Sequence, residues 1–242
     1  MKLTQVLKSL EYPGRLLAAG ADPAGAGLVV YVITGRSASS QARKLIRSGD
    51  KVMVRPTDEK TLKKGNPDLL IYSAVMASEV GLVVSNGKQT EDVYEAMRSE
   101  PNPAAALARA LGGWDYEPDS PIFTPRISAC VGRGKLALSV IRRGPAGESL
   151  REYFERPLAR GRAYMVSTYR GENLDPLPVF DRPPVEVETE DSDPHEAAER
   201  IYASLAPRTP GRDFRVAVAC VSFDPDHPAA AAVSIINRIE RR

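Results

Sequence analysis

The connection between the first two apolar segments limits the fold more than any other feature of this sequence. Residues Arg15 to Ala19 and Leu28 to Thr34 have the composition of β-strands, and the turn-rich stretch Gly20 to Gly27 separates them. Two parallel neighbouring strands need a crossover of a dozen or more residues, and this connection is too short for one. The pair is therefore predicted to be an antiparallel hairpin.

The same pattern recurs later, where Arg126 to Val131 and Leu136 to Ile141 are joined by Gly132 to Lys135. Further strands are predicted at Lys51 to Arg55, Leu69 to Met76, Gly81 to Ser85, Ala163 to Tyr169 and Arg215 to Phe223. Helices are predicted at Thr90 to Ser99, Pro103 to Leu111, Glu148 to Glu155 and Ala197 to Ala206. The last helix has the clearest start, with Asp193 as N-cap and Pro194 at the first helical position.

Antiparallel hairpins with helices grouped between them predict an α+β fold and argue against a doubly wound parallel sheet. A long apolar strand such as Leu28 to Ile33 needs cover on both faces, so we expect stacked sheets with helices outside. No interior linker divides the chain, which predicts a single domain over residues 1–242. Residues 170–193 are rich in proline and acid and are expected to form a mobile surface excursion.

Composition excludes several classes of function. The net charge is only +2, and Lys and Arg are scattered, so no nucleic-acid partner is expected. Cys130 and Cys220 lie in apolar runs and are expected to be buried, reduced thiols. The sequence shows no signal peptide or membrane-spanning segment, which predicts a cytoplasmic protein without a membrane partner. His195 and His227 have no metal-ligand spacing, so no metal is expected.

The stretch Tyr31 to Arg43 is the strongest candidate for a ligand site. An apolar strand runs directly into a loop with a glycine, three hydroxyl groups and two arginines: Gly35, Arg36, Ser37, Ser39, Ser40 and Arg43. Glycine lets the backbone approach a ligand closely, serines donate hydrogen bonds, and a guanidinium binds oxyanions through two parallel N–H groups. The composition alone is equally compatible with a phosphate-binding loop and with a solvated turn after an edge strand.

Other polar groups at the ends of apolar runs each have an ordinary structural explanation. Tyr72 in a strand usually fills core space, and Asn86-Gly87 is a strong signal for the apex of a hairpin. Glu117 and Asp119 beside Pro118 would normally be exposed carboxylates. Arg126 is most simply explained as a surface ion-pair partner.

Together these segments have an order that is more specific. It runs through Tyr12-Pro-Gly-Arg15, Gly35-Arg-Ser37 with Ser39-Ser40, Asn66-Pro67, Tyr72, Ser85-Asn-Gly87, Asp115-Tyr116, Thr124-Pro-Arg-Ile127 and Ser167-Thr-Tyr169. This order resembles the archaeal-type IMP cyclohydrolases over residues 12–169. The resemblance implies the four-layer αββα sandwich of antiparallel sheets found in N-terminal-nucleophile hydrolases. It also implies closure of the purine ring of 5-formamidoimidazole-4-carboxamide ribonucleotide (FAICAR) to IMP and water, without metal or organic cofactor.

The resemblance also implies roles for individual residues. The implied catalytic residues are Tyr72, Arg36, Arg126 and Glu117, and the implied substrate-binding residues are Arg15, Ser37, Asn86, Gly87, Thr124 and Tyr169. Tyr72 would move a proton or stabilise the oxyanion, and either Glu117 or Asp119 would act as base. Arg36, Ser37 and Arg15 would hold the anionic groups of the small-molecule ribonucleotide. Arg126 would bind phosphate or lower the pKa of Tyr72.

Two departures from the family pattern leave alternatives open. Residues 1–11 form an N-terminal extension, and the proline-rich segment after Tyr169 is additional. A related ribotide cyclohydrolase of a specialised pathway, or a non-catalytic nucleotide-binding module, would need similar anchors. An amidohydrolase with an N-terminal nucleophile is disfavoured, because Glu11 and Tyr12 precede the first strand. A homo-oligomer is a further expectation, since layered enzymes of this size often pair.

Overall fold

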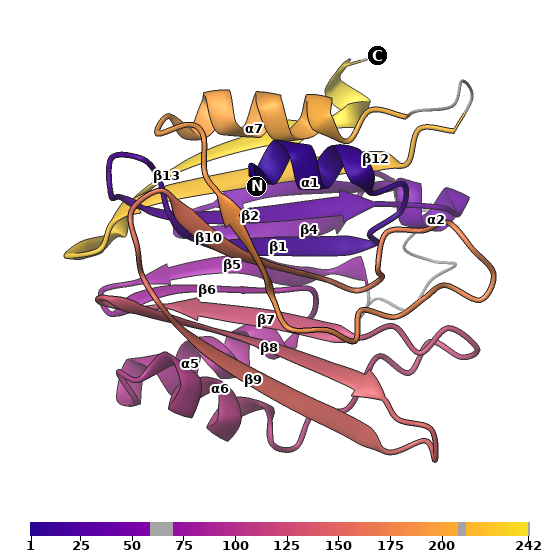
Figure 1. Ribbon diagram of the computed structural model, residues 1–242, viewed down its shortest axis with the longest axis horizontal. Coiled ribbons are helices and arrows are strands. Elements are labelled where there is room, and N and C mark those ends of the chain that lie inside the picture. Colours follow the sequence, from indigo (N-terminus) through magenta and orange to yellow (C-terminus); the bar gives the residue numbers. More distant parts are fainter. Residues whose placement is uncertain (59–69, 208–211, 242) are drawn as a thin grey trace.

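Two antiparallel β-sheets stacked face to face form the centre of the molecule, with helices on both outer sides (Figure 1). The computed structural model describes residues 1–58, 70–207 and 212–241. Within these residues the first sheet has six strands and the second has seven, and every pairing between neighbouring strands is antiparallel. The protein is therefore an α+β sandwich, as predicted.

The first sheet has the strand order β11-β10-β1-β2-β12-β13. Its strands are β1 (Arg15–Ala21), β2 (Gly27–Thr34), β10 (Arg162–Ser167), β11 (Val185–Glu188), β12 (Arg215–Asp224) and β13 (His227–Asn237). The predicted hairpin between the first two strands is confirmed, with Leu17 opposite Tyr31 and Ala19 opposite Val29.

The second sheet runs in simple chain order, β3-β4-β5-β6-β7-β8-β9. Its strands are β3 (Arg43–Ser48), β4 (Lys51–Pro56), β5 (Tyr72–Ser78), β6 (Gly81–Ser85), β7 (Arg126–Val131), β8 (Lys135–Arg143) and β9 (Ser149–Pro157). The predicted hairpin of β7 and β8 is confirmed.

The helices lie in two outer layers. Helices α1 (Leu3–Ser9) and α7 (Pro194–Ser204) cover the first sheet, whereas α5 (Gln89–Ser99) and α6 (Pro103–Leu111) cover the second (Figure 1). A short helix α2 (Ala38–Gln41) and a 3-10 helix η1 (Arg238–Arg241) complete the described elements. In this part of the chain, no helix combines the length and apolar character needed to cross a membrane.

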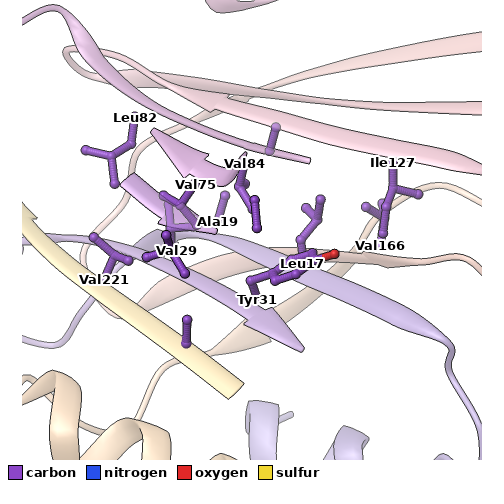
Figure 2. Packing of buried hydrophobic residues seen from close by; sticks show 14 of the residues in the cluster. Leu17, Ala19, Val29, Tyr31, Val75, Leu82, Val84, Ile127, Val166 and Val221 are labelled. Carbon is purple, nitrogen blue, oxygen red and sulfur yellow. The ribbon is translucent and has the colours of Figure 1, made fainter. Parts of the chain in front are cut away.

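The central strands are apolar on both faces because both faces are covered. On β2, Val29 and Tyr31 point into the layer between the sheets, and Val30 and Val32 point toward α1 and α7. Side chains of a strand alternate between its faces, so a strand covered on both sides needs apolar residues at every position. Figure 2 shows the inner layer, where Leu17 and Tyr31 of the first sheet lie opposite Val84 and Ile127 of the second.

The predicted helix starts agree well with the structure. The Asp193 carboxylate accepts hydrogen bonds from the backbone N–H groups of His195 and Glu196, which confirms it as the N-cap of α7. The predicted helices at Thr90 to Ser99 and Pro103 to Leu111 correspond to α5 and α6. The predicted strand at Leu69 to Met76 begins at Tyr72 as β5, and Leu69 lies outside the described residues.

One predicted helix is wrong, because Glu148 to Glu155 lies at the edge of the second sheet, where β9 begins at Ser149. Its aromatic residues favour a strand, and its charged residues pair across to β8 rather than along a helix. Arg142 contacts Glu152 at 3.1 Å, and Lys135 contacts Glu155 at 3.0 Å. Strands β3, β11 and β13 and helix α1 were not predicted.

The proline-rich segment is tied to the body of the protein at several points. Its strand β11 pairs with β10 and buries Val187 under the helices. Phe180 is fully buried between the sheets, and its N–H donates to the carbonyl of Thr168 at 3.2 Å. The Arg170 guanidinium also makes a bidentate contact with Asp181. By contrast, Leu174 in the same segment is exposed. Residues 1–11 likewise pack on the body of the protein, since Leu3 and Leu7 contact the apolar face of α7.

Replacing Phe180 should reveal this anchoring. We expect Phe180→Ala to lower the free energy of unfolding by about 3–5 kcal/mol, because it removes a fully buried ring and leaves a cavity. Leu174→Ala, in the same segment but exposed, should change it by less than ~0.5 kcal/mol. Chemical denaturation measures both values. Equal, small effects would show that Phe180 does not anchor this segment to the core.

Candidate active site

A cavity of about 300 Å³ opens where one edge of the two sheets meets the loop after β2. Polar and charged groups dominate its lining, which consists of Tyr12, Arg15, Arg36, Ser37, Ser39, Ser40, Arg43, Glu117, Asp119, Ile122, Thr124, Tyr169 and Leu177. Most predicted site residues thus converge on one place.

Strand direction explains the convergence. Arg43, Tyr72 and Arg126 are the first residues of β3, β5 and β7, which alternate with oppositely directed strands in the second sheet. In an antiparallel sheet such strands all begin at the same edge. Arg15 begins β1 of the first sheet and lines the same cavity as Arg43. The inner layer of the sandwich is apolar, so its polar groups gather at this edge.

The loop after β2, residues 35–40, is called the serine loop here and forms the exposed side of the cavity. Ser37 caps α2, and its hydroxyl accepts from the N–H of Ser40 at 3.2 Å. Gly35 is needed for the tight turn itself, because a Cβ there would lie 2.7 Å from the backbone carbon of Ser40. Arg36 is exposed, and its guanidinium lies 5.8 Å from the ring centre of Tyr12 and donates to the carbonyl of Leu174 at 3.0 Å.

Glu117 is a buried carboxylate, so the exposed position expected for it is wrong. It is 2% exposed, and its Oε2 lies 3.6 Å from Nη2 of Arg15. Burial raises the pKa of Glu117 above its ordinary value, although the charges of Arg15 and Arg126 act to lower it. A carboxyl group with a raised pKa that lines a cavity is suited to take and return protons.

Asn86 orients Glu117. Its Nδ2 donates to Oε1 of Glu117 at 3.2 Å and to the carbonyl of Pro125 at 2.9 Å. Its Oδ1 accepts from Nε2 of Gln89 and from the N–H of Ile127. All hydrogen-bonding positions of the amide are thus used within the protein.

Asn86-Gly87 lies between β6 and α5, so the predicted hairpin apex is wrong. The tight packing around Gly87 explains why a glycine stands there. A Cβ at this position would lie 2.7 Å from Nη1 of Arg126 and 2.6 Å from Oε1 of Gln89.

Arg126 is enclosed behind Glu117, so the surface ion pair expected for it is also wrong. Its Nε donates to the carbonyl of Asp115 at 2.8 Å, and its Nη1 donates to Oε1 of Gln89 at 3.0 Å. The guanidinium also stacks on Trp114, 4.7 Å from the ring centre. These contacts hold its charge in a fixed position near Glu117.

Tyr72 is buried in the layer between the sheets, and its hydroxyl lies 2.8 Å from the hydroxyl of Tyr31. Burial raises the pKa of the Tyr31 phenol, and the nearby Tyr72 acts in the same direction. Burial lowers the pKa of Arg43, as does the charge of Arg15, and Tyr72 has the opposite effect. The tyrosine pair therefore lies within electrostatic reach of the arginines that line the cavity.

Another side of the cavity is formed by Thr124 and the residues that contact it. Both carboxylate oxygens of Asp119 accept from Thr124, at 2.7 Å from its N–H and 2.6 Å from its hydroxyl. The Thr124 hydroxyl also lies 3.0 Å from that of Tyr169, which stacks on Tyr12. Burial raises the pKa of Tyr169 to about 12, so its hydroxyl stays protonated at neutral pH. Both carboxylate oxygens of Asp119 are thus occupied by Thr124.

The structure sorts the predicted site residues into two groups. Those that line the cavity are Arg15, Arg36, Ser37, Glu117, Thr124 and Tyr169. Those that lie behind the lining are Tyr72, Asn86, Gly87 and Arg126. Sequence reasoning missed Arg43 and Tyr31, although both belong to the stretch first singled out. Asn66-Pro67 lies outside the described residues.

Over residues 1–58, 70–207 and 212–241, no group of three or more His, Cys, Asp or Glu side chains is placed to hold a metal ion. Cys130 and Cys220 are buried free thiols, as predicted, and burial raises the pKa of both.

Comparison with known proteins agrees with this picture. A family model described as "IMP cyclohydrolase-like protein" matches residues 12–222. The IMP cyclohydrolase of Methanothrix thermoacetophila is 31% identical over 166 residues, which cover 69% of this chain and 78% of the relative. That of Methanococcus aeolicus is 28% identical over 65% of this chain and 74% of the relative. Because the family match extends over most of its length, the chain belongs to the IMP cyclohydrolase-like family.

Proposed function

We propose that this protein is an IMP cyclohydrolase, which closes the ring of FAICAR to give IMP and water. The observation that carries the proposal is the cavity, which brings a serine-arginine loop, a buried arginine and a carboxyl group of raised pKa together at one edge of the sandwich. Its volume of about 300 Å³ lies at the small end of the range of small-molecule sites. Family membership and the names of the relatives support the same activity.

The serine loop would hold the 5′-phosphate of the ribotide. Ser37, Ser39 and Ser40 present hydroxyl groups to the cavity, and Arg36 adds an exposed guanidinium that can turn toward an anion. A phosphate held there leaves the imidazole end of the ligand to reach toward Arg15 and Glu117. Binding at both ends would favour the folded conformer in which the two reacting groups touch.

The reaction itself needs proton transfer rather than a covalent nucleophile. The carboxamide nitrogen attacks the formyl carbon, and a C–N bond forms while the formyl oxygen gains negative charge. That nitrogen loses one proton, the formamido nitrogen loses another, and both leave with the formyl oxygen as water. Glu117 is the proposed base, because Asp119 is engaged by Thr124.

Three residues behind the lining would support this chemistry. Asn86 holds Glu117 in place through its hydrogen bond, and Arg126 contributes a fixed positive charge. Tyr72 is the proposed proton donor or oxyanion stabiliser, with its hydroxyl oriented by that of Tyr31. Arg126 and Arg15 would also stabilise the ionised form of Glu117 during turnover.

At the level of architecture, we propose a single domain with the layer order of the N-terminal-nucleophile hydrolases. The sequence helix, sheet, sheet, helix supports this assignment, since each sheet packs on the other through one face and on helices through the opposite face (Figure 1). In that arrangement the site lies at the edge where the two sheets meet.

The direct test is turnover by the purified protein. We expect the full-length chain, treated with a chelator and dialysed, to convert FAICAR to IMP, followed by the change in ultraviolet absorbance. Binding of IMP without any turnover at high protein concentration would point to a non-catalytic nucleotide-binding module. Turnover only with another formylated ribotide would identify a related cyclohydrolase.

The role of Tyr72 can be separated from that of Arg36. We expect Tyr72→Phe to lower kcat by about a hundredfold or more, with a small change in KM, because it removes a proton donor. Arg36→Ala should mainly raise KM. Tyr202→Phe, which alters a buried tyrosine of α7 on the far side of the first sheet, is the matched control and should behave like wild type. Near-normal turnover by Tyr72→Phe would make this phenol a core residue only.

The pH profile tests Glu117 as the base. A base must be ionised, and the pKa of Glu117 is raised, so kcat/KM should fall on the acid side at a pH above the ordinary range of a glutamate. Glu117→Gln should lose this acid limb and about a hundredfold or more in rate. Glu95→Gln, on the exposed face of α5, should keep the wild-type profile. Persistence of the limb in Glu117→Gln would exclude Glu117 as its source.

A further inference from the structure

A second cavity shares one lining residue, Arg36, with the candidate active site. It is called the arginine cavity because three arginines line it: Arg36, Arg212 and Arg238. The serine loop, α2, the proline-rich segment, the residues before β12 and η1 all contribute to its walls. Its volume of about 630 Å³ lies well within the range of small-molecule sites. The two cavities are therefore neighbours whose linings otherwise differ.

Positive charge predominates in the arginine cavity. Its acidic lining residues are Asp175 and Asp213. The Asp213 carboxylate is already engaged by Arg215, whose Nε and Nη2 donate to it at 2.9 and 2.7 Å. Three guanidinium groups thus remain against the single carboxylate of Asp175. A phosphate monoester carries up to about two negative charges and several acceptor oxygens, so it matches this lining better than a single carboxylate does.

Arg238 is held in a fixed direction by the base of the serine loop. Its Nη2 donates to Oε1 of Gln41 at 2.9 Å, and its Nη1 donates to the carbonyl of Asp213 at 3.0 Å. Nε2 of Gln41 donates in turn to the carbonyls of Gly35 and Asp213. These contacts use two of the five N–H donors of the Arg238 guanidinium. The network therefore ties this wall of the arginine cavity to the serine loop.

A buried acceptor without a donor belongs to the same lining. Oδ1 of Asn173 is buried and accepts no hydrogen bond from any described residue, whereas its Nδ2 donates to Oε1 of Glu11 at 3.3 Å. Buried polar groups are nearly always hydrogen-bonded, so an exception calls for an explanation. A ligand hydroxyl group would supply the missing donor. The lining thus combines groups that bind a phosphate with an acceptor that binds a hydroxyl.

We propose that the arginine cavity is a second ligand site, which binds a phosphate ester that carries hydroxyl groups, such as a sugar phosphate. Arg212 and Arg238 contact its phosphate, and one of its hydroxyl groups donates to Oδ1 of Asn173. The site is separate from that of the ribotide, because the serine hydroxyl groups and the proposed base line the other cavity only. The proposal does not depend on which reaction the protein catalyses.

Arg36 connects the two sites. Its guanidinium donates to the carbonyl of Leu174 at 3.0 Å and lies 5.8 Å from the ring centre of Tyr12, and it lines both cavities. Removing Arg36 should therefore weaken binding at both sites. By contrast, Arg212 lines the arginine cavity and Ser37 lines the other, so each can be used to test one site.

The experiment titrates ribose 5-phosphate into full-length wild type, Arg212→Gln, Ser37→Ala and Arg36→Ala by calorimetry. Arg47→Gln is the matched control, because this exposed arginine of β3 lines neither cavity. Wild type should bind two equivalents per chain. Arg212→Gln should raise the Kd of one site about tenfold or more, because a charge-assisted contact is lost, and leave the other unchanged.

The other variants complete the assignment. Ser37→Ala should weaken only the site that Arg212→Gln leaves intact, Arg36→Ala should weaken both, and Arg47→Gln should match wild type. Arg212 is exposed, so its replacement should not disturb folding. A wild type that binds one equivalent would overturn the proposal, as would two sites that both survive Arg212→Gln. Weakening of the same site by Arg212→Gln and Ser37→Ala would mean that one ligand spans both cavities, which also overturns it.

Inorganic phosphate separates a phosphate ester from a bare anion. Asn173→Ala should weaken ribose 5-phosphate in the arginine cavity and leave inorganic phosphate unchanged, because only the sugar supplies a hydroxyl donor. If Asn173→Ala leaves the affinity for the sugar phosphate unchanged, the assignment to an ester is wrong.

Turnover distinguishes this site from the proposed function. Arg212→Gln should keep the wild-type kcat and KM with FAICAR, and a large loss of turnover would place Arg212 in the ribotide site and overturn the separate site. A wild type that binds two equivalents of ribose 5-phosphate, one of them sensitive to Arg212→Gln, but does not turn over FAICAR would keep the second site and lose the cyclohydrolase.

Discussion

The face-to-face packing of the two sheets is the constraint on which the rest of this structure depends. Because each central strand is covered on one side by the opposite sheet and on the other by helices, almost no polar side chain can be placed in its middle. Polar chemistry is therefore confined to the edge of the sandwich. The first residues of β1, β3, β5 and β7 are an arginine, an arginine, a tyrosine and an arginine, and all four belong to the site or its support. The antiparallel arrangement thus assembles the site without bringing its residues together in the sequence.

Much of this fold could be predicted from local patterns. The short connection after β1 required a hairpin, and Asp193 with Pro194 marked the start of α7, because both signals come from backbone geometry within a few residues. The prediction failed where distant partners decide the structure. Residues 149–157 have helix-compatible charges, but cross-strand pairing with β8 makes them a strand. Strand β13 is rich in alanine, which has little strand preference of its own, and its pairing with β12 across a short turn determines its structure.

In the site, too, local sequence predicted some features and distant partners determined the others. The order of short motifs predicted six of the residues that line the cavity, but the partners that determine their burial are distant in the sequence. Glu117 and Arg126 looked like surface groups because each lies in a polar loop or at a strand start. They are enclosed because Arg15 from the other sheet, Asn86 and Trp114 close around them. Arg43 ends the stretch first singled out but was given no role of its own, and the shared direction of β3, β5 and β7 explains why it lines the cavity.

Burial at the edge of the sandwich also explains how one small cavity can hold a carboxyl group and a guanidinium group whose pKa values both shift toward the neutral form. Desolvation raises the pKa of Glu117 and lowers that of Arg43, so each is less strongly committed to its charged form than it would be in water. The contact between Arg15 and Glu117 limits this effect on the carboxylate without removing it. The amide of Asn86 is fully engaged by protein groups and Arg126 donates through Nε and Nη1, whereas the Nε donors of Arg15 and Arg43 have no partner among the described residues. The hydrogen bonds of Asn86 and Arg126 thus fix the polar groups of the candidate site within the protein itself.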